Sequence, residues 1–170
     1  VRTGYSAIAD EWVPIRPGTD GALLLALIHE IIALGLYDRE FLVRNTNAGQ
    51  LVNVDEAHDE AGLFVRTDVP AEEGCYDPQN KLWWDRVTNE PVITHSEGAD
   101  PYLHGEFRLR DGRKVKPAFQ LLRDRVAHYT PEWASAITGI PAATIRRLAH
   151  EMGITARDHR IELPIAWTDA

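Results

Sequence analysis

The run from Pro14 to Asp20, Pro-Ile-Arg-Pro-Gly-Thr-Asp, has the residue types best suited to hold a ligand. It leads into an apolar stretch that is expected to be a helix, and a helix start offers free backbone N–H groups and a positive dipole end. This setting suits a phosphate or a polar ring. The carboxylate of Asp20 could also accept two parallel hydrogen bonds from the N1–H and exocyclic amine of a guanine. The residues alone leave open a plainer interpretation, in which Thr19 or Asp20 only caps the helix.

Other reactive residue types give weaker signals. The chain has seven histidines, and none lies in an H-E-x-x-H pattern. His58, His95 and His104 lie among carboxylates, so a metal site there stays an alternative. Cys75 follows Glu-Glu-Gly, and neighbouring acids raise a thiol pKa, which makes it a poor nucleophile. If the pair Trp83-Trp84 lies in a strand, its rings point to opposite faces, so we expect one to be exposed and able to stack on a sugar.

The composition is that of a globular protein and excludes several classes. The 170 residues carry 18 Lys+Arg and 26 Asp+Glu, which gives a formal charge of −8. A general nucleic-acid binder needs a basic face, so none is expected here. A single cysteine excludes a disulfide framework, a four-cysteine zinc site and an iron–sulfur site built from this chain alone. No apolar run approaches the ~18 residues of a membrane span.

The elements that would position the Pro14–Asp20 run are mostly helical. Apolar periodicity and capping residues predict helices over 20–35, 117–128, 131–138 and 141–152, and a short one from Asp38 to Arg44. Gly35, Gly139 and Gly153 are expected to end the helices that precede them. The stretch 22–34 is apolar nearly all round, so we expect it to be buried on most sides. Because so short a chain cannot cover it, the isolated chain is expected to expose an apolar patch and to associate.

The middle of the chain predicts short strands. Residues 51–55 and 62–66 alternate between apolar and polar side chains, and 82–87 with 91–94 form a hairpin around Thr88-Asn89-Glu90. A second hairpin joins 106–110 to 113–116 through Asp111-Gly112, a pair typical of a type I′ turn. These strands are polar on one face, so we expect an excursion on the surface of a larger body.

Charge divides the chain into three parts. Residues 53–106 hold 13 acidic and 3 basic side chains, and residues 107–128 hold 7 basic and 2 acidic ones. We therefore expect a ligand-binding loop with buried helices over 1–50, an acidic β-rich insertion over 51–116 and a helical return over 117–170. Val1 follows no initiator Met, and residues 161–167 read as an extended segment, so the chain is expected to be a piece of a longer protein.

Three stretches resemble one known family, in the order found there. AIADEWVPIRPGTDGAL at 7–23, followed by DREFLVRNTN at 38–47, resembles a signature of the molybdopterin oxidoreductases of the dimethyl sulfoxide reductase family. YTPEWA at 129–134 and TGIPAATIRRLA at 138–149 resemble the next landmark. The acidic middle matches less firmly. Residues 1–7 and 164–169 look most like the branch with sulfite dehydrogenases and thiosulfate or polysulfide reductases.

The resemblance implies a catalytic subunit that binds two molybdopterin guanine dinucleotides around one molybdenum or tungsten. This chain would be part of its α/β, dinucleotide-binding domain, carrying a small irregular β-hairpin insertion. Gly18, Thr19 and Asp20 match the loop that holds a guanine end of the cofactor. The metal ligand and the cysteines of a 4Fe-4S cluster lie N-terminal to this region in the family, so no catalytic or metal-binding residue is assigned in this chain.

The resemblance also implies partners: a membrane anchor subunit, an iron–sulfur electron-transfer subunit, and the rest of the catalytic subunit. It leaves open whether the protein works at the cytoplasmic face of the membrane or in the periplasm. The substrate would be a small inorganic sulfur compound. A second hypothesis, from a different class, is a non-catalytic module whose acidic middle docks a basic partner.

Overall fold

The computed structural model describes residues 4–70 and 79–160. They form two compact units, which are described separately. The helical unit consists of residues 4–38 and 126–160, and the β unit lies within Arg39–Arg125, between the two halves of the helical unit in the sequence. Helices and small antiparallel sheets together confirm the mixed α/β class. Cys75 and the extended segment expected at 161–167 lie outside the described residues.

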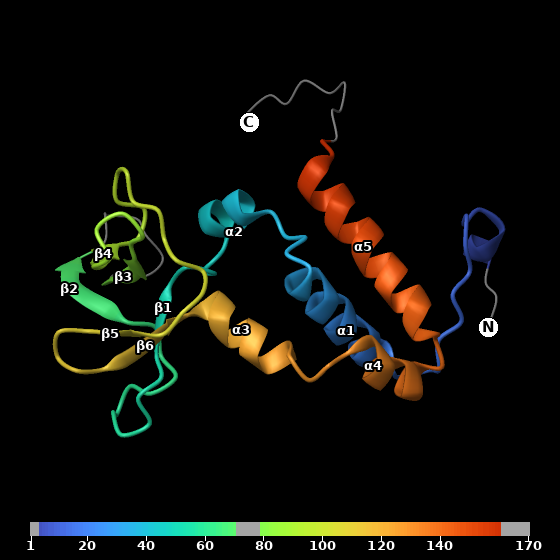
Figure 1. Cartoon of the computed structure of the whole chain (residues 1–170), viewed down its shortest axis with the longest axis horizontal. Coiled ribbons are helices and arrows are strands. Elements are labelled where there is room, and N and C mark those ends of the chain that lie inside the picture. Colours follow the sequence, from blue (N-terminus) through green and yellow to red (C-terminus); the bar gives the residue numbers. More distant parts are fainter. Residues whose placement is uncertain (1–3, 71–78, 161–170) are drawn as a thin grey trace. The chain divides into compact units, whose positions relative to one another are not determined.

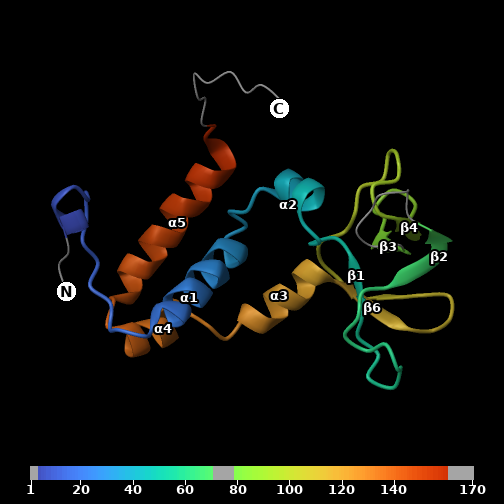
Figure 2. The same ribbon diagram turned by 180° about the vertical axis from the view of Figure 1, so that it is seen from behind.

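Three helices make the helical unit (Figures 1 and 2). α1 is Asp20–Ala33, α4 is Pro131–Thr138 and α5 is Ala142–Asp158, and a short 3-10 helix, η1, covers Gly4–Ala7. α1 and α5 lie side by side with both N-termini at the same end, next to α4. Small side chains let these helices approach closely, and the core is made of Ala26, Leu27, Ala134, Ile140, Ile145 and Ala149.

α4 has the boundaries that the sequence predicted, because its signals are local. The hydroxyl of Thr130 accepts a hydrogen bond from the N–H of Trp133 at 3.3 Å, and Pro131 occupies the first turn. Gly139 ends the helix in the left-handed region, at φ 78°, which only glycine adopts without strain.

α5 is longer than predicted, and Gly153 does not end it. The helix continues to Asp158, with Gly153 buried inside it. A Cβ atom at Gly153 would lie 2.6 Å from the Cβ of Leu36 and 3.2 Å from the carbonyl oxygen of Leu36. Gly153 therefore allows the backbone of α5 to approach the segment that follows α1, which is a packing role rather than a helix stop.

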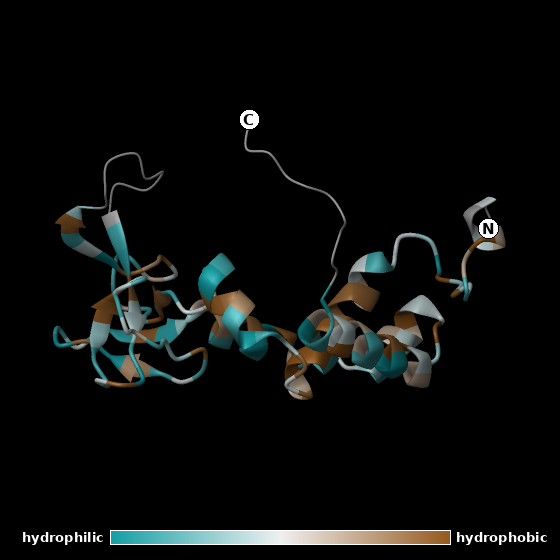
Figure 3. Ribbon diagram, turned by 90° about the horizontal axis from the view of Figure 1, so that it is seen from above, coloured by the Kyte–Doolittle hydropathy of each residue, from teal (hydrophilic) through white to brown (hydrophobic). Residues whose placement is uncertain are grey.

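α1 is covered on one side only in the described chain. Ala26, Leu27 and Glu30 are buried against the other helices, whereas Leu24 and Leu34 are more than half exposed. Figure 3 shows how hydrophobic and hydrophilic segments alternate along the helices and strands. The expected apolar patch is therefore present, while the expectation that α1 is buried on most sides is not met within this chain. None of the described helices combines the length and hydropathy that a membrane crossing requires.

The β unit contains two three-stranded antiparallel sheets and two helices. One sheet has the order β1-β6-β5 and the other β2-β3-β4. The strands are β1 (Leu51–Asn53), β2 (Arg66–Pro70), β3 (Gln79–Trp84), β4 (Pro91–Ile93), β5 (Phe107–Arg108) and β6 (Lys114–Pro117). The helices are α2 (Arg39–Asn45) and α3 (Ala118–Val126). Both predicted hairpins are present, because β3 pairs with β4 and β5 with β6.

Two details of the predicted strands are wrong. β2 begins at Arg66, where the predicted strand 62–66 ends, and the preceding residues form only an isolated bridge between Phe64 and Val52. The Asp111-Gly112 turn is not type I′, because only Gly112 has a positive φ, at 94°. The N–H of Gly112 donates to the carbonyl of Leu109, and that of Leu109 to the carbonyl of Arg113. This is a three-residue loop that ends in a left-handed glycine.

The tryptophan pair belongs to the core of the β unit. Trp83 is 4% exposed and Trp84 is 8% exposed, so the expected exposed ring and its sugar platform are wrong. The ring of Trp84 stacks on Phe107 at 4.7 Å between centroids, and its Nε1–H donates to the side-chain oxygen of Asn89 at 3.0 Å. The β unit thus has its own core, which contains Leu51, Val65, Trp84, Leu109 and Val115.

Asp85 makes the stability of the β3–β4 hairpin depend on pH. Its carboxylate is buried and accepts hydrogen bonds from the N–H of Asp100 at 2.9 Å and from the N–H and hydroxyl of Thr88, both at 2.8 Å. These bonds lower the pKa of Asp85 from 3.8 to about 2. A lowered folded-state pKa stabilises the fold above about pH 4, and this stabilisation is lost as the pH falls towards 2.

We therefore expect Asp85→Asn to weaken protection of the 85–100 segment against hydrogen–deuterium exchange at pH 5. Between pH 4 and 2 the wild type should lose protection faster, so the difference between the two proteins should shrink. An equal difference at both pH values would contradict the assigned role of the Asp85 carboxylate.

Candidate functional site

The loop from Arg16 to Thr19 forms a tight turn immediately before α1. The N–H of Thr19 donates to the carbonyl of Arg16 at 3.3 Å, which closes a four-residue turn. Pro17 presets its own φ, and Gly18 has a φ of 79°, so this pair matches the central residues of a type II turn. The sequence Arg-Pro-Gly-Thr therefore fixes the entry of the chain into α1.

Thr19 does not cap the helix in the way the sequence suggested. Its hydroxyl donates back to the carbonyl of Arg16 at 2.6 Å, and its side chain accepts no capping hydrogen bond. The carbonyl of Thr19 instead accepts the first N–H bonds of the helix, from Ala22 at 3.0 Å and Leu23 at 3.4 Å. The Thr19 side chain therefore tightens the turn.

Asp20 and Gly21 form the exposed first turn of α1. Within residues 4–70 and 79–160, no side chain or backbone group bonds the Asp20 carboxylate or the N–H groups of Asp20 and Gly21. An acceptor-only carboxylate thus lies beside two backbone donors at the positive end of a helix dipole. The structure brings Gly18, Thr19 and Asp20 together as one rigid corner, as their adjacency in the sequence requires.

Arg16 is a residue of this corner that the sequence reasoning missed. Its backbone N–H donates to the carbonyl of Thr138 at 3.0 Å, and its Nη1 donates to the carbonyls of Ala136 at 2.9 Å and Ile137 at 3.1 Å. These are carbonyls of the last turn of α4, where cations are favoured by the dipole. No local signal could have revealed this role, because the partners lie 120 residues away in the sequence.

Ion pairs connect α5 to the rest of the helical unit. Arg146 of α5 lies 3.5 Å from Glu30 of α1 and also pairs with Glu132 of α4. The Arg146 guanidinium lowers the pKa of the Glu132 carboxyl. Arg147 pairs with Glu11, in the segment before the turn, at 2.5 Å. Exposed pairs of this kind contribute little each, but here they join four segments around the corner.

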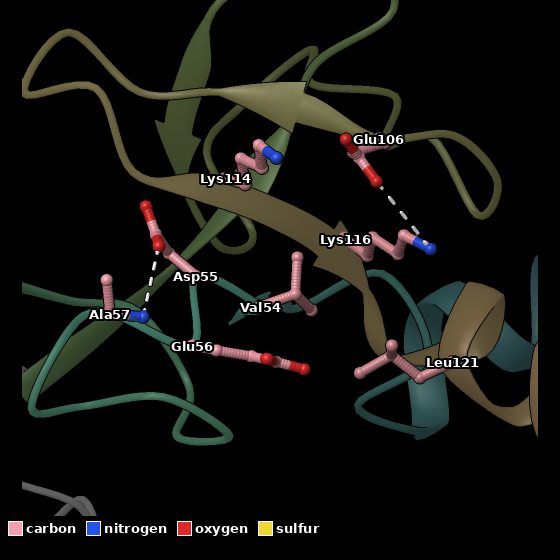
Figure 4. Close-up of a pocket in the computed structure, with 8 residues that line it drawn as sticks. All are labelled: Val54, Asp55, Glu56, Ala57, Glu106, Lys114, Lys116 and Leu121. Carbon is pink, nitrogen blue, oxygen red and sulfur yellow. Dashed lines mark hydrogen bonds and ion pairs between the residues drawn. The ribbon is translucent and has the colours of Figure 1, made fainter.

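A shallow groove in the β unit has mixed charge (Figure 4). It is lined by Val54, Asp55, Glu56, Ala57, Glu106, Lys114, Lys116 and Leu121. The Lys116 amine lies 3.7 Å from Glu106 and 3.0 Å from Asp124, and the hydrogen bond to Asp124 is the main reason that the pKa of Lys116 is raised. The charged groups of the groove largely neutralise one another, so it offers no defined chemistry.

The described histidines do not gather around a metal. No group of three or more metal-ligating side chains occurs in the parts of the chain that the structure describes. The His58 ring accepts the N–H of Glu60 at 3.1 Å, His95 packs against Trp83, and His104 packs against Phe119. Burial lowers the pKa of His104, helped by repulsion from Arg123. These histidines serve local packing and turns.

Comparisons with curated proteins place the chain within larger oxidoreductase subunits. It is 65% identical to a sulfite dehydrogenase subunit of Allochromatium vinosum, over 99% of this chain and 18% of that protein. It is 37% identical to the perchlorate reductase alpha subunit of Dechloromonas aromatica, over 84% of this chain and 18% of that protein. It is 32% identical to a "Putative dimethyl sulfoxide reductase catalytic subunit" of Halobacterium salinarum, over 88% and 17%.

No protein-family model matches the chain. The chain spans less than a fifth of the length of these three relatives. The match nevertheless covers nearly all of this chain, including both stretches whose motifs carry the resemblance. The chain therefore belongs to the dimethyl sulfoxide reductase family of molybdopterin oxidoreductases and corresponds to a segment of their large subunits.

Proposed function

We propose that this chain forms the guanine-binding corner of a bis-molybdopterin guanine dinucleotide oxidoreductase. In this proposal Gly18, Thr19 and Asp20 hold one guanine end of the cofactor, within a dinucleotide-binding α/β domain. The supporting observation is the free Asp20 carboxylate beside the free N–H groups of Asp20 and Gly21 within the described residues, on a turn fixed by hydrogen bonds.

The donor set fits the chemistry of a guanine. The base presents two donors side by side, the N1–H and the exocyclic amine, next to the O6 acceptor. A carboxylate can accept from both donors at once, and a backbone N–H can donate to an oxygen acceptor. A Cβ at Gly21 would meet no other atom within 4 Å, so the first turn of α1 leaves space for a planar ring.

The residues of this chain bind and orient, and none is proposed to react. Gly18 shapes the turn, Thr19 locks it to Arg16, and Asp20 fixes the edge of the base. The bound cofactor, with its molybdenum or tungsten, would supply the two-electron chemistry. A 4Fe-4S cluster would carry electrons away, with its cysteine ligands outside this chain.

The substrate is proposed to be a small inorganic sulfur compound such as sulfite. The 65% identity to a sulfite dehydrogenase subunit supports this choice over the perchlorate named for a more distant relative. Both of these relatives are named as subunits, which supports a complex with other chains. We propose a membrane anchor subunit together with an iron–sulfur electron-transfer subunit as these partners. The alternative of a non-catalytic acidic module has no such support.

The proposal is tested on the intact protein, purified with its cofactor. Acid release should yield about two guanine nucleotides per molybdenum or tungsten atom, counted by chromatography and by elemental analysis. The same preparation should oxidise sulfite with an artificial electron acceptor. Metal without guanine nucleotide would overturn the guanine role, and loading without turnover of sulfur compounds would overturn the substrate assignment.

A further inference from the structure

We infer that Arg16 is a positioning residue that gives the corner its selectivity for guanine. This inference rests on the proposed function, since it concerns how the Asp20 carboxylate is held. Arg16 itself is not expected to touch the base.

The Arg16 side chain and its N–H anchor the corner to α4. Together they satisfy three successive carbonyls at the end of that helix, at Ala136, Ile137 and Thr138, with distances of 2.9–3.1 Å. The guanidinium lies close to Gly139, where an added Cβ would be 3.4 Å from the Arg16 Nε. Gly139 thus both ends α4 and leaves room for this contact.

The Arg16 carbonyl holds the other side of the corner. It accepts the N–H of Thr19 at 3.3 Å and the Thr19 hydroxyl at 2.6 Å. One residue therefore connects the end of α4 to the residue immediately before Asp20. If the guanidinium left α4, the turn would keep its internal hydrogen bonds but lose its fixed orientation relative to the helices.

An arginine is required because two carbonyls are bound through one planar group. Arg16 Nη1 reaches both carbonyls from a rigid fork, whereas a lysine amine is a single mobile donor on a flexible stem. A glutamine has a shorter side chain and no charge to interact with the helix dipole.

Guanine selectivity is the property that depends most on this orientation. Guanine and hypoxanthine differ only by the exocyclic amine, so the second hydrogen bond to Asp20 decides between them. A carboxylate that rocks can keep one hydrogen bond but loses the aligned pair. We therefore expect Arg16 variants to lose discrimination more than overall binding.

The experiment measures GDP and IDP binding to cofactor-free intact protein. The wild type should bind GDP at least tenfold more tightly than IDP. Arg16→Gln should reduce this ratio to about two or less, and Arg16→Lys should give an intermediate ratio. Arg44→Gln removes an exposed arginine that pairs with Glu40 within α2, and it should leave the ratio unchanged.

The outcomes separate this inference from the function on which it rests. A wild type that binds GDP and IDP equally would overturn the guanine role itself. If the wild type discriminates and Asp20→Asn does not, the guanine role stands. An Arg16→Gln variant that keeps the wild-type ratio would then overturn the inference, even if it binds both nucleotides more weakly, because such a loss would reflect folding alone.

Discussion

Replacing Asp20 with Asn in the intact protein is expected to lower the guanine-nucleotide content at least tenfold. A hydrogen bond to a charged group contributes about 1.5–3 kcal/mol, and about 1.4 kcal/mol is a factor of ten. Asn keeps the size of Asp but puts an amide donor opposite a guanine donor. Metal and released guanine nucleotide per protein would be measured together with the melting temperature.

The structure makes this substitution discriminating, because Asp20 does not cap α1 through its side chain. The change should cost the fold only the attraction of a first-turn acid to the helix dipole, about 0.3–1 kcal/mol. Asp10→Asn, at another exposed aspartate of the helical unit, serves as the control and should retain full loading. Full loading in Asp20→Asn would leave Asp20 with no role beyond the helix dipole.

Gly153→Ala is expected to destabilise the helical unit by about 1–3 kcal/mol, the usual cost of overpacking a core. The added methyl would lie 2.6 Å from the Cβ of Leu36, an atom that moves only with the backbone. α5 would have to shift away from α1, which would weaken the contacts of Ile145 and Ala149. Hydrogen–deuterium exchange of α1 and α5 in the intact protein would report the change as faster exchange.

Gly21→Ala provides the matched control for this prediction. Gly21 is also a helical glycine, but an added Cβ there meets nothing within 4 Å. Alanine is favoured over glycine in a helix by up to about 1 kcal/mol, so Gly21→Ala should leave exchange unchanged or slow it. If both variants exchanged alike, the contact between Gly153 and Leu36 would not limit the packing of α5.

The sequence predicted elements whose signals are local. Thr130, Pro131 and Gly139 lie within one short segment, and together they predicted both ends of α4. The two β hairpins also followed from alternating residues around short polar turns. The adjacency of Gly18, Thr19 and Asp20 ensured that they would form one corner, while their role in binding stays a prediction.

The features that were missed depend on contacts between distant residues. Gly153 resembles a helix stop in the sequence, and only the approach of Leu36 explains it. Thr19 resembles a cap, but its hydroxyl has a nearer acceptor in the turn. Arg16 bonds carbonyls that no sequence pattern connects to it. Trp84 is buried because Phe107, from another hairpin, stacks on it.

The order in which the units are synthesised follows from the insertion of the β unit between α1 and α4. On the ribosome, α1 emerges first, and α4 and α5 follow only after the whole of Arg39–Arg125. At 5–20 residues per second this delay is on the order of ten seconds. During that time the apolar side of α1 has no partner from its own unit, while the β unit already has its complete core. The nascent chain should therefore fold its second unit first and should need chaperone protection at α1.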